Sequence, residues 1–219
     1  MKEAVIVGSG ASLLGSGLGT KIDSIETVFR FKFKNFSLQE YCHDTGIKTD
    51  VMISNCNHEV CALHLRDLKR GLMKKFGIKK LVFSSTRRAS HRRHAWKALW
   101  KYVKKNKIDA TIFRYDEGGK VVLDGLGIDY KGLSFRHSWT AGLNSLVNLL
   151  NNYYKFHPVH FEEYRFDKIY LCGFDYLTDT PSTQHFYKRA KVTNWHNLDS
   201  EAKIIRQLIE KTDKVAILR

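Results

Sequence analysis

The sequence has little proline and few cysteines. Of its 219 residues only Pro158 and Pro181 are prolines, so no proline-rich linker divides the chain, and we expect one domain spanning 1–219. The four cysteines, at positions 42, 56, 61 and 172, contain no C-x-x-C pair. This spacing favours a reduced, intracellular protein over one held together by disulfides.

Long apolar runs are also missing. No stretch approaches the roughly 18 consecutive apolar residues of a membrane-spanning helix. The first three residues, Met1-Lys2-Glu3, lead straight into the short apolar run 4–7, which is too short for the core of a signal peptide. We therefore expect a cytoplasmic protein without a transmembrane segment.

Acidic residues are absent from one long part of the chain. Between Lys69 and Lys107 there are fifteen Lys or Arg and no Asp or Glu, a charge equal to the net +15 of the whole protein. Such segregation favours a face that binds a polyanion, although a basic helix can also simply be solvated. The residues that we expect to bind a polyanionic acceptor are Arg87, Arg88, Arg92, Arg93, Lys97 and Lys101.

What the sequence does contain is an alternation of apolar runs with helical patterns. The runs 4–7, 27–31, 50–53, 80–84, 111–115, 168–172 and 215–218 indicate strands. Helical spacing occurs after Ser90, where Trp96, Leu99, Trp100 and Val103 share a face, and in 140–152 and 199–211. The pattern predicts an α/β fold, namely a single Rossmann-like domain with a mostly parallel sheet flanked by helices.

A glycine turn, Gly8-Ser9-Gly10-Ala11-Ser12-Leu13, directly follows the first predicted strand. Glycines let the backbone approach a phosphate closely, and a following helix start attracts negative charge. The turn is not a dinucleotide fingerprint, because Leu13 replaces the third glycine and no acidic residue ends the strand 27–31. A NAD-dependent dehydrogenase is therefore disfavoured, and a turn that serves packing alone is the alternative.

Polar and small residues follow other predicted strands or begin a helix. They are Asn55 after the third strand, Thr140, Ala141 and Gly142 at a helix start, and Gly173 and Asp175 after the strand 168–172. Parallel sheets place ligands at the carboxyl ends of their strands, so these residues are candidates for binding a substrate. Each also has a plain structural alternative, as a turn asparagine, a helix cap or a close-packed glycine.

A polar, irregular segment near 177–195 could form a lid, and His196 follows it. Histidine titrates near pH 6.5, which suits a general base. Metal chemistry is weakly indicated. The spacing of Cys56, His58, Cys61 and His64 is loosely compatible with zinc, but the chain has no Asp-x-Asp of the type that holds a metal against a nucleotide diphosphate. We therefore expect no metal.

Taken in chain order, these motifs resemble those of the bacterial lipooligosaccharide sialyltransferases. The family's G-x-G-P-S-L turn corresponds to 8–13, with Ala11 in place of proline, and its V-F-R strand to 28–30. Asn55 matches an asparagine after the third strand, and Thr140-Ala141-Gly142 is similar to a T-S-G helix start. The segment 169–176 is similar to I-Y-L-S-G-I-D-F, and 196–199 to the region of the catalytic histidine, H-S-x-N-T-D.

The resemblance implies a variant of the GT-A glycosyltransferase fold and an inverting, metal-independent transfer from a CMP-activated sugar. In that scheme His196 takes the proton from the acceptor hydroxyl, and Tyr176 and Tyr187 are the nearest tyrosines to steady the leaving phosphate. No cofactor is implied beyond the nucleotide-sugar donor. The implied donor-binding residues are Gly8, Ser9, Gly10, Ser12, Asn55, Thr140, Ala141, Gly142, Gly173 and Asp175.

The acceptor is the least defined part of this hypothesis. Longer members of that group carry a basic carboxyl-terminal extension, whereas this sequence ends at Arg219 and places its positive charge within 69–107. We therefore expect a polyanionic acceptor, with DNA carrying a hydroxylated base as one form. A sialyltransferase that uses CMP-sialic acid and a bacterial surface glycan is one alternative, and a non-enzymatic nucleic-acid-binding α/β module is another.

Overall fold

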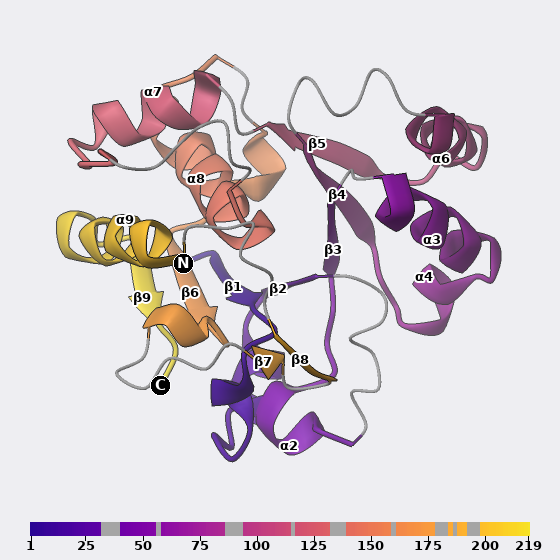
Figure 1. Cartoon of the computed structure of the whole chain (residues 1–219), viewed down its shortest axis with the longest axis horizontal. Coiled ribbons are helices and arrows are strands. Elements are labelled where there is room, and N and C mark those ends of the chain that lie inside the picture. Colours follow the sequence, from indigo (N-terminus) through magenta and orange to yellow (C-terminus); the bar gives the residue numbers. More distant parts are fainter. Residues whose placement is uncertain are drawn as a thin grey trace.

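The computed structural model describes residues 1–31, 40–55, 58–85, 94–114, 117–131, 139–158, 161–177, 184–185, 188–191 and 198–219. Its centre is a seven-stranded sheet in the order β5-β4-β3-β2-β1-β6-β9 (Figure 1). The strands are β1 (Glu3–Val7), β2 (Thr27–Phe31), β3 (Val51–Asn55), β4 (Lys80–Ser85), β5 (Ala110–Arg114), β6 (Lys168–Cys172) and β9 (Val215–Ile217). Every pairing in this sheet is parallel, so the predicted strands and the α/β fold are confirmed, with strand ends displaced by one or two residues.

Helices cover both faces of the sheet. On one face lie α1 (Gly19–Ser24) and α2 (Cys42–Thr45) beside β1 and β2, and α3 (His58–Lys69), α4 (Leu72–Lys75) and α6 (His94–Lys105) beside β3 to β5 (Figure 1). On the opposite face lie α7 (Glu117–Gly125), α8 (Ala141–Tyr154) and α9 (Leu198–Lys211). None of these helices has the length and apolar character needed to span a membrane.

Each strand contains a mostly apolar run because both faces of the sheet are buried. Ala4 and Ile6 of β1 pack in the cluster beneath α8 and α9, whereas Val5 and Val7 pack in the cluster beneath α1. Aromatic rings fill the first cluster, where the ring centroids of Phe29 and Phe166 lie 5.8 Å apart. A parallel sheet covered on both sides requires such continuous apolar runs, which is why these strands could be found in the sequence.

Helix α6 has the two faces that its spacing predicts. Trp96, Leu99 and Val103 are buried against the sheet, while Lys97 and Lys101 are exposed. The ring centroids of Trp96 and Phe83 of β4 lie 5.1 Å apart. The apolar stripe therefore fixes the helix on the sheet and leaves its lysines in solvent.

The segment expected to be an irregular lid contains some regular structure. The 3₁₀ helix η4 (Asp175–Leu177) ends at the first residue of the segment, which also includes a short antiparallel pair, β7 (Gln184–His185) and β8 (Lys188–Lys191). Two- and four-residue polar strands carry no apolar alternation, so the sequence analysis missed them. The remaining residues of the expected lid lie outside the described ranges.

Candidate functional site

The glycine turn and the segment after β6 leave the sheet side by side. Val7 pairs with Cys172 at the carboxyl ends of β1 and β6. Beyond that pair, the Gly8 N–H donates to the Cys172 carbonyl at 2.8 Å, and the Gly10 N–H donates to the Gly173 carbonyl at 2.8 Å. The two segments therefore continue the ladder as one unit past the edge of the sheet.

The Asp175 carboxylate holds the glycine turn from this neighbouring segment. Its Oδ2 accepts the N–H of Ala11 at 2.7 Å, and its Oδ1 accepts the N–H of Ser12 at 3.0 Å. A Cβ placed on Gly10 would lie 1.8 Å from Asp175 Oδ1, so only glycine permits this approach. Asp175 thus caps the 3₁₀ helix η1 (Ala11–Leu13) by accepting its first N–H groups, as an N-cap side chain does at the start of an α-helix.

This arrangement bears on the prediction that the turn binds a phosphate. Two of its amides, those of Ala11 and Ser12, already donate to Asp175, which is 5% exposed. The side chain of Ser12 is exposed and that of Ser9 is half-buried. The hydroxyls are therefore better placed to meet a ligand than those two amides, and direct contact between Asp175 and a donor stays a prediction.

The same segment also touches the start of α8. A Cβ on Gly142 would lie 2.4 Å from Cε1 of Phe174, so the missing side chain allows the Phe174 ring to pack against the first turn of α8. Thr140 is the N-cap of this helix, and its Oγ1 accepts the N–H of Leu143 at 3.2 Å. Residues 173–175 therefore bridge the two predicted donor-binding segments, Phe174 toward α8 and Asp175 toward the glycine turn.

A buried carboxylate that the sequence analysis missed ties α9 to this site. Oε1 of Glu201 accepts the Thr140 N–H at 2.7 Å, and Oε2 accepts the Thr140 hydroxyl at 2.5 Å. Glu201 is 1% exposed, and burial raises its pKa from 4.5 to about 7. A signal was present, because Glu201 shares the i, i+3, i+4, i+7 stripe with the buried Ile204, Ile205 and Leu208.

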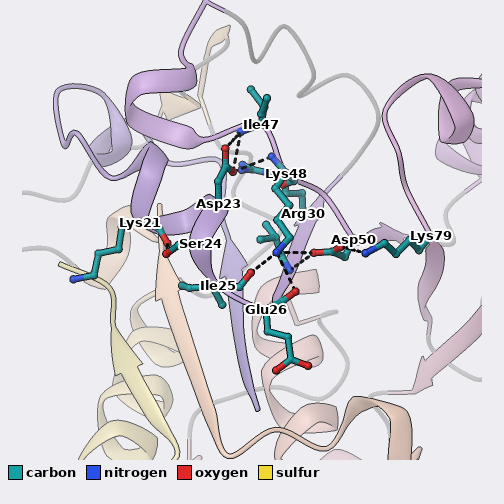
Figure 2. A network of polar contacts seen from close by, with 11 residues as sticks. Lys21, Asp23, Ser24, Ile25, Glu26, Arg30, Ile47, Lys48, Asp50 and Lys79 are labelled. Carbon is teal, nitrogen blue, oxygen red and sulfur yellow. Dashed lines mark hydrogen bonds and ion pairs between the residues drawn. The ribbon is translucent and has the colours of Figure 1, made fainter. Parts of the chain in front are cut away.

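A polar network holds the loop after α2 against β2. The guanidinium of the buried Arg30 donates to the Lys48 carbonyl at 2.9 Å and to the Thr45 carbonyl at 2.5 Å. Figure 2 shows Asp23 bonded to the amides of Ile47 and Lys48 in the same loop. Burial lowers the pKa of Arg30 to about 10. Arg30 of β2 therefore supports the fold by holding the loop that enters β3.

Several of the predicted site residues lie outside the residues that the structure describes. His196 and Tyr187 lie outside the described residues, and so do the side chains of Asn55 at the end of β3 and Tyr176 in η4. Of the predicted polyanion-binding residues, Lys97 and Lys101 are exposed on α6, while Arg87, Arg88, Arg92 and Arg93 lie outside the described ranges. The glycine turn, the start of α8 and residues 173–175 are thus the part of the site whose assembly can be seen.

Within the described ranges, no three His, Cys, Asp or Glu side chains gather as a set of metal ligands. Cys61 and His64 are both buried on α3. Cys56 and the side chain of His58 lie outside the described residues. The expectation of a metal-free site and the zinc alternative therefore both stay predictions.

The amino-terminal half of the chain, residues 1–109, matches the family model of glycosyltransferase family 29 (sialyltransferase). The chain is a sialyltransferase-like glycosyltransferase. This region includes the glycine turn and the Arg30 network. The non-enzymatic alternative is set aside by the match, whereas the narrower assignment to the bacterial lipooligosaccharide enzymes stays a prediction.

Crystal structures of a mammalian sialyltransferase share the fold. One, in complex with Gal-beta-1-3GalNAc-ortho-nitrophenol, has a TM-score of 0.55 and 16% identity, covering 99% of this chain and 69% of that chain. Another has a TM-score of 0.58 and 16% identity, covering 99% of this chain and 68% of that chain. No curated protein sequence matches the chain significantly. At this identity the likeness concerns the sialyltransferase fold, and the predicted fold class is confirmed.

Proposed function

We propose that the chain transfers a sugar from a CMP-sugar, with CMP-sialic acid favoured, to a hydroxyl of a glycan. The observation that carries the proposal is the bridge formed by Phe174 and Asp175 between the glycine turn and the start of α8. It joins the two predicted donor-binding segments at the carboxyl edge of a parallel sheet, the edge where such sheets bind ligands. The sialyltransferase family of the chain supports CMP as the nucleotide.

In this proposal the donor lies over the carboxyl ends of β1 and β6. Of the first-turn amides of α8, that of Leu143 already donates to the N-cap Thr140, while those of Ala141 and Gly142 lie at the positive end of the helix dipole and suit the donor phosphate. Ser12 supplies an exposed hydroxyl from the glycine turn. Asp175, Phe174 and Glu201 act on the donor indirectly, by fixing the segments that meet it.

The proposed chemistry is a single displacement with inversion. The acceptor oxygen forms a bond to the anomeric carbon while the bond from that carbon to the CMP oxygen breaks, and CMP leaves with the electron pair. His196 takes the proton of the acceptor hydroxyl, a role for which histidine is the side chain best suited near neutral pH. Tyr176 and Tyr187 are proposed to donate hydrogen bonds to the leaving phosphate, which avoids the need for a metal.

A glycan acceptor is favoured over hydroxylated DNA. The family consists of sialyltransferases, and one of the mammalian structures that share the fold holds Gal-beta-1-3GalNAc-ortho-nitrophenol. A disaccharide exposes its hydroxyls, whereas a base in duplex DNA would have to be flipped out of the stack. The DNA acceptor predicted from the charge of 69–107 has no comparable support.

The proposal is tested by supplying CMP-sialic acid in EDTA with that disaccharide glycoside or with duplex DNA containing a hydroxylated base. We expect CMP release and a sialylated glycoside, and a loss of at least about 100-fold in rate for His196→Ala. His43→Ala is the matched control, since the His43 side chain is 88% exposed, and it should keep its activity. An active His196→Ala protein would remove the base assignment, and transfer to DNA alone would remove the glycan acceptor.

A further inference from the structure

Helices α3, α4 and α6, with the turns that follow them, present a layer of nearly uniform positive charge. We call this the basic layer, and its exposed members are Arg66, Lys69, Arg70, Lys74, Lys75, Lys79, Lys97, Lys101, Lys104, Lys105 and Lys107. Among the described residues between 61 and 107, the single acidic one is Asp67, which is buried, with its Oδ1 3.5 Å from Nε of Arg66. Two members of the layer are therefore ion-paired, Arg66 with Asp67 and Lys79 with Asp50 at 2.7 Å, and the lysines of α4 and α6 carry most of the remaining charge.

Most of this charge lies at the edge of the sheet opposite the candidate site. Helix α3 connects β3 to β4 and α6 connects β4 to β5, so each helix runs antiparallel to the strands and ends at their amino edge. Lys69, Lys74, Lys75, Lys104 and Lys105 belong to the last turns of these helices. Figure 1 shows α3, α4 and α6 together on one flank, with α9 at the other side of the molecule. The layer thus does not converge on the proposed donor site.

The composition of the basic layer indicates which polyanion it fits. Of the exposed cations in the described part of the layer, nine are lysine and two are arginine, and the basic segment also contains Arg87, Arg88, Arg92 and Arg93, which lie outside the described residues. Lysine is a strongly hydrated point charge and lacks the rigid fork with which arginine grips individual phosphates of nucleic acids. Half-buried apolar side chains lie among the lysines, with the Lys104 ammonium 5.0 Å from the Trp100 ring centroid and the Lys75 ammonium 5.5 Å from that of Phe76. Aromatic rings flanked by lysines are typical of surfaces that rest on lipid headgroups.

We propose that the basic layer docks the protein on an anionic lipid surface, with the end that carries α4 toward the headgroups. The candidate active edge then faces away from the lipid, where a glycan can reach it. This inference goes beyond the proposed function and does not depend on it, because lipid binding requires neither donor nor acceptor. Clustered lysines near an anionic bilayer each strengthen binding by about fivefold, and their effect fades within about 10 Å at 0.1 M salt.

The experiment measures cosedimentation of the full chain with vesicles of phosphatidylcholine, with and without about 30% phosphatidylserine. We expect binding only to the anionic vesicles, weakened in 0.5 M salt, and a loss of at least about tenfold for Lys74→Glu/Lys75→Glu/Lys104→Glu/Lys105→Glu. The matched control, Lys120→Glu/Lys131→Glu/Lys203→Glu/Arg206→Glu, removes the same charge from exposed residues of α7, α9 and the loop after α7. It should bind within about threefold of the unmodified protein.

Three outcomes would overturn the proposal. The first is that the unmodified protein does not bind the anionic vesicles. This outcome requires no variant, so it remains decisive even if the charge-reversed protein does not fold. The second is an equal loss in the control variant, which would assign binding to net charge rather than to the basic layer. The third is tighter, lysine-dependent binding to duplex DNA at the same salt, which would make the layer a nucleic-acid surface.

Discussion

Three buried charged side chains hold segments that flank the sheet, Asp175 and Glu201 at its carboxyl edge and Arg30 at the loop that enters β3. Arg30, Asp175 and Glu201 are 2%, 5% and 1% exposed, and each bonds main-chain groups of a neighbouring segment. A buried charge is tolerated only where such bonds replace water, so these residues fix the geometry of the loops that they hold. Asp175 bonds Ala11 across 164 residues of sequence, a contact that no local pattern predicts.

Glu201 makes the stability of the fold depend on pH. Its folded pKa, about 7, lies above the usual 4.5, so the folded state binds more protons between these values and stability falls as pH rises through them. The shift is worth up to roughly 3 kcal/mol. Glu201→Gln keeps the shape and can still accept the Thr140 N–H, with its amide NH2 donating to the Thr140 hydroxyl, but it cannot ionise, so the pH dependence from this group should vanish.

Urea unfolding at pH 5 and pH 8 measures this effect. The free energy of unfolding of the unmodified protein, taken relative to Glu201→Gln, should be lower at pH 8 than at pH 5. Lys203→Gln is a suitable control, because Lys203 is exposed on the same helix. Parallel pH profiles for Glu201→Gln and the unmodified protein would show that Glu201 does not titrate in this range.

At the scale of elements, the close contact between α8 and the segment after β6 can be tested by substituting Gly142. Gly142→Ala should gain about 1 kcal/mol of helix propensity, yet its Cβ would lie 2.4 Å from Cε1 of Phe174. We expect the clash to dominate and to lower the free energy of unfolding by about 1–2 kcal/mol. CMP affinity should fall as well, because the first turn of α8 would shift.

Gly118→Ala is the matched control in α7, where the new Cβ would meet only His157 at 3.4 Å. It should leave the free energy of unfolding unchanged or raise it by up to about 1 kcal/mol. Both variants can be compared by chemical denaturation, and CMP affinity by calorimetry. If Gly142→Ala were as stable as Gly118→Ala, the packing of Phe174 on α8 would not constrain the site.

The type of element, helix or strand, could be predicted from the sequence wherever burial imposes a regular spacing on the apolar residues. The two-sided burial of Ala4 to Val7 and the stripe of Trp96, Leu99 and Val103 both leave a pattern in the sequence. The strands β7 and β8 leave none, because they are short, polar and defined by pairing with each other. The glycine turn was located correctly, but the sequence does not reveal that Asp175 occupies two of its amides.

For the molecule as a whole, the order of the motifs carried more information than any one of them. The glycine turn, the strand with Arg30, the helix start at Thr140 and the segment 173–175 are individually common features. Their order predicted a sialyltransferase-like glycosyltransferase, and the family match over residues 1–109 confirms this prediction. The acceptor was not predictable, because acceptor contacts depend on the placement of residues far apart in the sequence, which no local pattern fixes.

The most direct test of the central claim is a thermal-shift comparison of CMP, CDP, UMP, UDP, GDP and NAD in EDTA. The account predicts that CMP stabilises the protein most. At one hundred times its dissociation constant, CMP should add roughly 2.7 kcal/mol to the free energy of unfolding without any metal. A larger shift with UDP, a shift that needs magnesium, or no shift with any of these nucleotides would contradict a metal-independent CMP site at the bridged edge of the sheet.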